Sequence, residues 1–230
     1  MPSPVLAAEH LSKTFVSGRE PRAVLTDVSL AVAPGEWVAI TGPSGVGKTT
    51  LLHVLAGILP PDAGRVEWLG TDLYALGESA RDGLRVRDAG IVFQFHHLMP
   101  DLTVEENIRL ALRMARTNGG PGGHDGEVRS VLDRLGLADR AASRIEELSG
   151  GERQRIAVAR ALIHQPKILF ADEPTGHLDG QSASGVLDLI DEACKRRQVA
   201  VVLSTHNPAV AARVDRRVDL RSGRLQTAGE

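Results

Sequence analysis

The feature that most constrains the fold of this chain is a glycine-rich octapeptide that directly follows an apolar segment. The octapeptide matches G-x-x-x-x-G-K-[ST] at every fixed position. Its residues are Gly42, Pro43, Ser44, Gly45, Val46, Gly47, Lys48 and Thr49, and Thr50 follows. Glycines let the backbone N–H groups curl inward around phosphate oxygens, and a helix N-terminus behind them adds partial positive charge. The pattern predicts a phosphate-binding loop in which Lys48 neutralises the β and γ phosphates and the Thr49 hydroxyl ligates Mg²⁺.

The rest of the chain alternates short apolar runs with segments of helical character. The runs at residues 38–41, 168–171 and 200–203 are almost wholly apolar, which is typical of strands buried on both faces. Helical segments are expected at residues 48–56, 151–163, 183–195 and 209–214. Alternation of this kind predicts an α/β fold with a mostly parallel sheet covered by helices.

Two further regions depart from this alternation. Residues 5–15, 24–32 and 65–69 have the pattern of strands joined by turns, which predicts a small antiparallel sheet. Residues 73–144 form a mostly helical insert, in which Thr103 and Glu106 have the spacing of a capping box. The glycine-rich stretch 118–126 is expected to be a flexible surface loop. The sequence contains no linker long enough to divide it, so residues 1–230 are predicted to form one domain.

Composition excludes several classes of function. Hydrophobic residues make up 42% of the 230 residues, enough for a substantial core. The net charge of −2 and the lack of a long basic run argue against a nucleic-acid partner. The single cysteine, Cys194, rules out an internal disulfide. The N-terminus has no signal-peptide pattern, and the apolar runs are too short to span a bilayer, so any membrane role is expected to come through a partner.

A second chemical signal is a pair of carboxylates at the end of the segment 167–173, which reads KILFADE. Its apolar residues predict a buried strand, and parallel sheets bind ligands beyond the carboxyl ends of their strands. Asp172 is suited to hold Mg²⁺ directly or through water, and Glu173 to polarise an attacking water molecule. Alone, a strand that ends in Asp-Glu more often begins a surface turn. The phosphate loop in the same chain favours the metal and general-base interpretation.

The segment 148–152 is the most specific indication of a protein family. It consists of Leu148, Ser149, Gly150, Gly151 and Glu152. The spacing of Ser149 and Glu152 also fits an ordinary capping box, but a cap does not require two glycines, which lower helix propensity. Together with residues 153–155 and 157–161, the segment resembles the signature sequence of ABC ATPases. The resemblance implies that the γ-phosphate of a nucleotide held by a second molecule approaches this helix start.

The resemblance covers essentially the whole chain and implies further site residues. Gln94 resembles the Q-loop glutamine, His206 the switch histidine and Asp179 the D-loop aspartate. Phe15 lies where the family places an aromatic that stacks on adenine, although a core position is the alternative. The implied catalytic residues are Glu173, His206 and Gln94, and the implied metal ligands are Thr49, Gln94 and Asp172. The implied fold is that of a P-loop NTPase, with a RecA-like core, an antiparallel β-subdomain, an α-helical subdomain at roughly 73–144 and a signature helix at 149–163.

The Q-loop region narrows the resemblance to one group of ABC ATPases. Residues 93–103, with 106 and 107, resemble the group that contains the lipoprotein-releasing, macrolide-export and cell-division ATPases. The resemblance implies that the surface beside the Q-loop docks a short helix of a membrane partner. The candidate contacts are Phe95, His96, His97, Leu98 and Met99, and packing of Leu98 and Met99 inside the helical subdomain is the alternative. His177 and Asn207 depart from this group, which usually has asparagine and aspartate there.

The function implied is an ATP-binding and ATP-hydrolysing transporter subunit that uses Mg²⁺. Two copies would sandwich two ATP molecules head to tail. The homodimer would sit on the cytoplasmic face of the inner membrane, as a peripheral subunit bound to two copies of a permease subunit or to two different ones. Its cargo would be a lipoprotein or a lipophilic, peptide or drug-like compound. The alternatives are a cell-division ATPase, a non-transport ABC ATPase and a regulatory module without catalysis.

Overall fold

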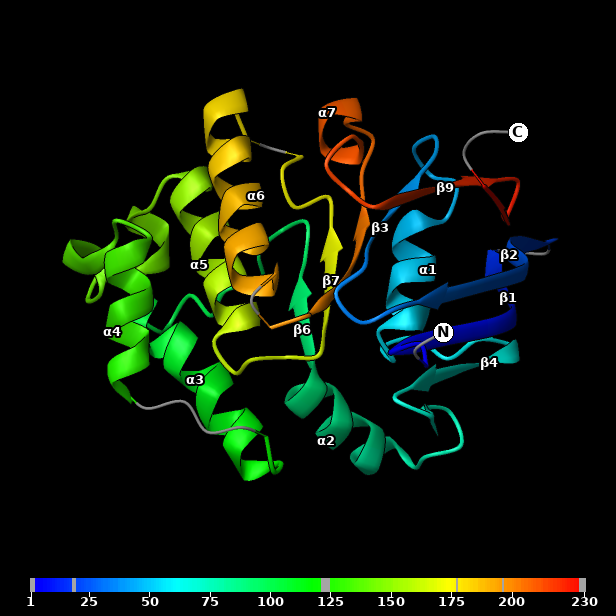
Figure 1. Ribbon diagram of the computed structural model, residues 1–230, viewed down its shortest axis with the longest axis horizontal. Helices are drawn as coiled ribbons and strands as arrows, with labels where there is room; N and C mark the ends of the chain where they lie inside the picture. Colours follow the sequence, from blue (N-terminus) through cyan, green and yellow to red (C-terminus); the bar gives the residue numbers. More distant parts are fainter. Residues whose placement is uncertain (1–2, 18–19, 121–124, 177, 196, 228–230) are drawn as a thin grey trace.

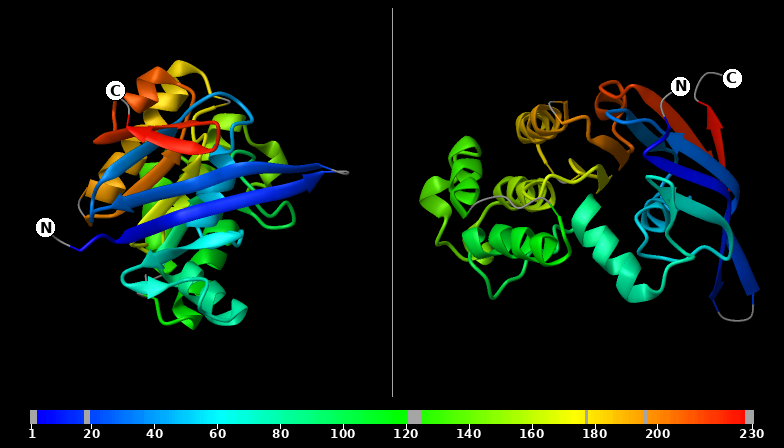
Figure 2. Two further views of the ribbon diagram at one scale, coloured as in Figure 1. Left: turned by 90° about the vertical axis from the view of Figure 1, so that its right-hand side faces the viewer. Right: turned by 60° about the horizontal axis from the view of Figure 1, so that its bottom comes forward.

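The computed structural model describes residues 3–17, 20–120, 125–176, 178–195 and 197–227. These residues form a six-stranded and a four-stranded sheet, with helices between and around them (Figures 1 and 2). His177 and part of the glycine-rich stretch, residues 121–124, lie outside the described ranges. Within those ranges, no helix has both the length and the apolar character needed to cross a bilayer.

The six-stranded sheet carries the expected parallel core. Its order is β10-β9-β3-β8-β7-β6, and only β10 pairs antiparallel to its neighbour among these described strands. The strands are β3 (Trp37–Thr41), β6 (Ala89–Val92), β7 (Ile168–Asp172), β8 (Ala200–Ser204), β9 (Arg216–Arg221) and β10 (Arg224–Thr227). Every residue of β7 and β8 is buried, because helices cover both faces of the sheet there.

The four-stranded sheet is antiparallel, with the order β2-β1-β4-β5. Its strands are β1 (Leu6–Ser17), β2 (Glu20–Val32), β4 (Ala63–Trp68) and β5 (Thr71–Asp72). Helix α1 (Lys48–Leu55) lies between the two sheets (Figure 1). One buried cluster joins all three layers, and in it the Trp68 ring stacks on Phe170 with centroids 5.6 Å apart. This packing fixes the phosphate loop, which leads into α1, against both sheets.

Helix α5 links the large sheet to an outer helical layer. On the face of the sheet away from α1 pack α5 (Gly150–Leu162), α6 (Gly180–Lys195) and α7 (Pro208–Ala211). The other side of α5 packs against α3 (Val104–Thr117), α4 (Asp125–Arg134) and two 3₁₀ turns, Ala138–Arg140 and Ile145–Glu147. In α5, Val158 belongs to the sheet-facing cluster, whereas Ile156 and Ala159 belong to the outer one. A shift of α5 would therefore displace side chains in both the sheet-facing and the outer cluster.

The expected fold class is confirmed, and the differences from the sequence predictions are local. The predicted capping box at Thr103 and Glu106 starts α3. The helical insert is interrupted by β6, a strand of the large sheet, and α2 (Glu78–Asp88) packs through Leu84 against the cluster around α1. The helix expected at 209–214 ends at Ala211, where the chain turns toward β9. Strands β9 and β10 were not predicted, because Arg and Asp occupy the outward positions of β9 and leave only two buried apolar residues.

Candidate functional site

The phosphate loop has the conformation that its glycines allow. Gly42, Gly45 and Gly47 have φ angles of 140°, 73° and 112°, where other residues are strained. A Cβ at Gly42 would lie 2.5 Å from the carbonyl oxygen of Leu220, and one at Gly47 would lie 2.6 Å from Cγ1 of Val24. At two of its three glycines, the loop backbone therefore approaches neighbouring strands more closely than a side chain permits.

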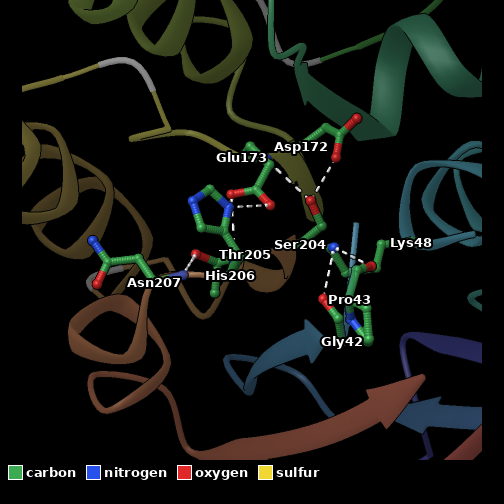
Figure 3. A network of polar contacts seen from close by, with 9 residues as sticks. All are labelled: Gly42, Pro43, Lys48, Asp172, Glu173, Ser204, Thr205, His206 and Asn207. Atoms are coloured by element: carbon green, nitrogen blue, oxygen red, sulfur yellow. Dashed lines mark hydrogen bonds and ion pairs between the residues drawn. The ribbon is translucent and has the colours of Figure 1, made fainter. Parts of the chain in front are cut away.

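Lys48 closes the loop from the inside. Its Nζ donates hydrogen bonds to the carbonyl oxygens of Gly42 at 2.9 Å and Pro43 at 3.1 Å, and the residue is only 8% exposed (Figure 3). Because Gly47 at the N-cap of α1 has no side chain, the first N–H groups of the helix receive no side-chain cap. The loop thus presents a cation and helix-end amides, which together favour an anion.

A cavity of about 430 Å³ opens over this loop. Most of the predicted nucleotide and catalytic residues line it together. They are Phe15, Ser44, Gly45, Gly47, Lys48, Thr49, Thr50, Gln94, Asp172, Glu173 and His206, with Arg22, Val24 and Gly176 in addition. Phe15 is 41% exposed at the rim, so the core interpretation of this residue is wrong. Val46 packs against the buried cluster instead of lining the cavity.

Strand β7 ends at the cavity with two acidic residues, and the neighbouring β8 ends with Ser204. Asp172 pairs with Ser204 in the parallel register, and the Ser204 hydroxyl donates a hydrogen bond to Oδ1 of Asp172 (Figure 3). The N–H of Glu173 donates to the carbonyl oxygen of Ser204 at 3.2 Å and to its hydroxyl at 3.1 Å. Ser204 therefore binds the carboxylate of Asp172 and the backbone of Glu173. Sequence reasoning missed it, although a hydroxyl residue ending a buried strand two positions before His206 was the available signal.

The Glu173 carboxylate is held on its outer side by His206. Oε1 of Glu173 lies 2.9 Å from Nδ1 of His206, and Oε2 accepts from the His206 N–H at 3.4 Å. The Glu173 side chain is 12% exposed, whereas the His206 side chain is 64% exposed. Asn207 does not contact Glu173. Its side chain accepts from Ala209 N at 2.9 Å and caps α7, a role that asparagine and aspartate fill equally well.

The donor groups in the cavity suit a hard cation that is completed by phosphate and water. Thr49 supplies a hydroxyl, Asp172 a carboxylate and Gln94 an amide, and all three line the cavity. Oxygen ligands of this kind are what Mg²⁺ prefers. Among the described residues, no three His, Cys, Asp or Glu side chains gather to bind a metal by themselves. A site with one carboxylate and several open positions fits a metal that arrives with a nucleotide.

The candidate partner contacts beside Gln94 divide into exposed and packed residues. Phe95 is 71% exposed and Met99 is 49% exposed. Leu98 packs against the outer helical cluster, as the alternative interpretation proposed for it. His96 is half-buried and His97 is exposed. The apolar surface available here therefore comes from Phe95 and Met99.

The signature segment does not line the cavity. Ser149 N and Oγ donate to Glu152 Oε2 at 2.8 and 2.7 Å, and Glu152 N donates back to Ser149 Oγ at 3.3 Å, which completes a capping box at the start of α5. A Cβ at Gly151 would lie 3.4 Å from Oγ of Ser182, whose hydroxyl donates to Asp179 at 2.8 Å. The D-loop aspartate thus lies beside the signature helix, while both remain apart from the phosphate loop of the same chain.

A phosphate-binding loop at the carboxyl edge of a parallel sheet, with two carboxylates at the end of β7, two strands away in the same sheet, defines a P-loop nucleotide-binding protein. Residues 25–176 match the family model described as ABC transporter. The chain belongs to the ABC transporter family, and it is an ATP-hydrolysing cassette of that family.

Curated relatives align with almost the full length of the chain. The lipoprotein-releasing system ATP-binding protein LolD of Ruegeria pomeroyi is 45% identical, with 98% of each chain covered. LolD of Pseudomonas syringae pv. tomato is 45% identical over 97% of this chain and 98% of its own. A dimeric, post-hydrolysis structure of the ATP-binding cassette MJ0796 bound to ADP and Pi is similar, with a TM-score of 0.88, 30% identity and 96% of each chain covered.

Proposed function

We propose that the chain is the ATP-hydrolysing subunit of a lipoprotein-releasing transporter. The observation that carries this proposal is 45% identity to LolD proteins over nearly the whole of both chains. The cavity over the phosphate loop supports the chemical part, because it collects a buried cation, two carboxylates, an amide and a histidine at one edge of the sheet.

Hydrolysis is assigned to the groups that surround this cavity. Lys48 leaves the carbonyl oxygens of its own loop to bind the β and γ phosphates. Glu173 accepts a proton from, or polarises, the water that attacks the γ phosphorus. His206 keeps the Glu173 carboxylate oriented through its 2.9 Å contact, and it is exposed enough to turn toward the γ-phosphate. Phe15, at the rim, is the proposed stacking partner for adenine.

Mg²⁺ is the proposed cofactor. Thr49, Asp172 and Gln94 would hold it, directly or through water, and it would neutralise charge that develops on the phosphate oxygens. Ser204 contributes by fixing one oxygen of Asp172, which leaves the other carboxylate oxygen for the metal. A buried carboxylate with a single hydrogen-bond donor on one oxygen is well prepared for this task.

Two copies of the chain are proposed to form a head-to-tail sandwich. The signature residues Leu148 to Glu152 lie apart from the cavity of their own chain, so they are free to serve the nucleotide of a second copy. The known dimeric structures of MJ0796, one with ADP and Pi, are consistent with such an arrangement. ATP would favour the closed dimer by mass action, and loss of the γ-phosphate would release it.

The membrane partner is proposed to bind beside the Q-loop. The exposed side chains of Phe95 and Met99 offer the apolar contacts for a short helix, and His96 and His97 flank them. The chain would then be a peripheral subunit on the cytoplasmic face of the inner membrane. It would serve two copies of one permease subunit or two different permease subunits.

Reconstitution tests the cargo. The chain is co-expressed with candidate permease subunits of the same organism, and the purified complex is placed in vesicles that carry an acylated lipoprotein. ATP is expected to release the lipoprotein into the soluble fraction, and a Glu173→Gln complex is expected to retain it. If the vesicles instead lose a macrolide, or if the complex co-purifies with cell-division proteins and releases no lipoprotein, the cargo assignment is wrong while the ATPase assignment stands.

A further inference from the structure

The Q-loop begins with a strained turn. The N–H of His96 donates to the carbonyl of Phe93 at 3.1 Å, and that of His97 donates to the carbonyl of Phe95 at 2.6 Å. His96 and His97 have φ angles of 62° and 47°, so two consecutive residues with side chains adopt the left-handed region. Each such residue costs roughly 1–2 kcal/mol, and the conformation persists only where its surroundings hold it.

One side chain of the signature helix binds this turn through two backbone carbonyls. Arg160, in the last turn of α5, donates from Nη2 to the carbonyl oxygen of His96 at 2.7 Å and from Nη1 to that of His97 at 2.5 Å. The planar guanidinium binds the two successive carbonyls through two separate nitrogens held in a fixed fork, a geometry that the single ammonium nitrogen of lysine does not offer. Burial lowers the pKa of Arg160, because the guanidinium is partly removed from water.

The opposite side of the same turn rests on the helix that follows the phosphate loop. The Phe93 ring meets the His97 ring with centroids 4.7 Å apart. It also meets the ring of His53, on α1, edge-on at 6.1 Å. The turn is therefore fixed between α1 and α5, and Gln94, which lines the cavity, lies inside the fixed segment.

We propose that Arg160 is a positioning residue for Gln94, and that through it α5 connects the signature segment to the metal edge of the same chain's cavity. Arg160 follows Ser149 by eleven residues, which is roughly 16 Å along one continuous helix. When the start of α5 engages the nucleotide of the partner copy, the same helix carries the Q-loop turn with it. The inference rests on the proposed function, because it requires Gln94 to act on the metal-bound nucleotide.

The expected result of removing the guanidinium is a defect in turnover with little change in nucleotide binding. In the full-length chain, Arg160→Ala is expected to lower kcat about 10-fold to 100-fold while KM for ATP changes by less than about 2-fold. Arg160→Lys keeps the positive charge but has a single donor nitrogen. Its kcat is expected to lie between those of the unmodified chain and Arg160→Ala. Millimolar guanidinium chloride, below any unfolding concentration, is expected to restore part of the Arg160→Ala rate, whereas sodium chloride is not.

A double-mutant cycle separates positioning from general damage. If Arg160 acts through Gln94, adding Arg160→Ala to a Gln94→Ala chain should lower kcat by less than about 2-fold further. Arg134→Ala is the matched control, because Arg134 lies on α4 and donates to the carbonyl of Ser130 within its own helix. It is expected to leave kcat unchanged. If Arg160→Ala does not fold, as judged by thermal unfolding, the same cycle is run with Arg160→Lys.

Three outcomes of these kcat measurements test the role of Arg160. A kcat loss that disappears in the Gln94→Ala background supports the inference. If the kcat losses of the two single variants multiply in the double variant, the inference is wrong. It is also wrong if Arg160→Ala lowers kcat while Gln94→Ala does not. A near-normal rate of Glu173→Gln would instead reject the proposed hydrolytic function, which keeps failure of the function distinct from failure of the inference.

Discussion

Two helix starts in this molecule are rich in glycine, and they are built for different reasons. At the start of α1, the phosphate-loop glycines Gly42 and Gly47 are required by the chain itself, since a Cβ would meet Leu220 or Val24 at 2.6 Å or less. At the start of α5, neither glycine has a φ in the left-handed region. A Cβ on Gly150 meets nothing within 4 Å, and one on Gly151 meets only ordinary contacts with Ser182 and Arg155.

Helix α3 shows that the cap at α5 does not need glycine. Both helices begin with a capping box of the same geometry, from Thr103 and Glu106 in α3 and from Ser149 and Glu152 in α5. In α3 the first helical residue is Val104, which is fully buried. The capping residues of α5 therefore serve the fold, whereas its glycine pair keeps space open for something outside the chain. That difference is the physical argument for a nucleotide bound in trans.

The largest expected effect is the loss of ATP turnover in the Glu173→Gln variant. The same variant is the starting point for the dimer measurements that compare the two helix starts. Glu173→Gln removes the proposed base but keeps the size of the side chain and one acceptor oxygen. Phosphate release is expected to fall about 10³-fold, the usual contribution of a general base, while ATP binding is retained. Phosphate release and fluorescent-nucleotide titration measure the two quantities. Hydrolysis at a near-normal rate would contradict the role of Glu173.

The next effect tests the open space at α5. In the Glu173→Gln background, Gly151→Leu should weaken the ATP-dependent dimer at least about 100-fold, because the side chain occupies the approach to the helix-end N–H groups. The thermal midpoint of the monomer should change little. Sedimentation with and without ATP measures the dimer. Gly185→Leu is the matched control, since Gly185 is an exposed helical glycine in α6 with nothing within 4 Å of an added Cβ. If Gly151→Leu leaves the affinity of the ATP-dependent dimer unchanged, the proposed ATP sandwich is wrong.

A third effect separates glycines required by the fold from glycines that are not. Gly47→Ala places a Cβ 2.6 Å from Val24 at a φ of 112°, so we expect a loss of about 2 kcal/mol of stability. For a chain of this size that corresponds to about 4–8 °C in Tm. Gly150→Ala should leave Tm unchanged or slightly higher, because alanine favours the helix. Differential scanning calorimetry compares the two, and equal losses would contradict the contrast drawn between the loops.

Much of the fold was predictable because its signals are local. The octapeptide at Gly42, the apolar runs of β7 and β8 and the capping box at Thr103 each specify their structure within a few residues. The sequence signals a hydroxyl at the end of β8, but the contacts of Ser204 with the Asp172 carboxylate and the Glu173 backbone depend on the register between β7 and β8. The same holds for Arg160, which is 63 residues distant from His97 in sequence and meets it only through tertiary packing.

The smallest effect compares the two capping carboxylates and depends on pH. Hydrogen bonds from the Ser149 hydroxyl and N–H lower the pKa of Glu152, and bonds from the Thr103 N–H and hydroxyl lower that of Glu106. Because both folded-state pKa values lie below the ordinary value of 4.5, the stability from these charges is present above that pH. It is lost as the pH falls through the lowered values. Glutamine keeps the capping geometry without the charge, so Glu152→Gln should lower Tm by about 1–3 °C at neutral pH, with the difference vanishing in acid.

The two substitutions should differ once ATP is present. A carboxylate beside the proposed γ-phosphate position repels it, so Glu152→Gln in the Glu173→Gln background should tighten the ATP-bound dimer by about 2-fold to 5-fold at low salt, less at high salt. Glu106→Gln should lower Tm in the same pH-dependent way but leave the dimer unchanged, because its helix start faces no nucleotide. Sedimentation at two salt concentrations measures both. Identical responses of the two variants to ATP would mean that the start of α5 is only a cap.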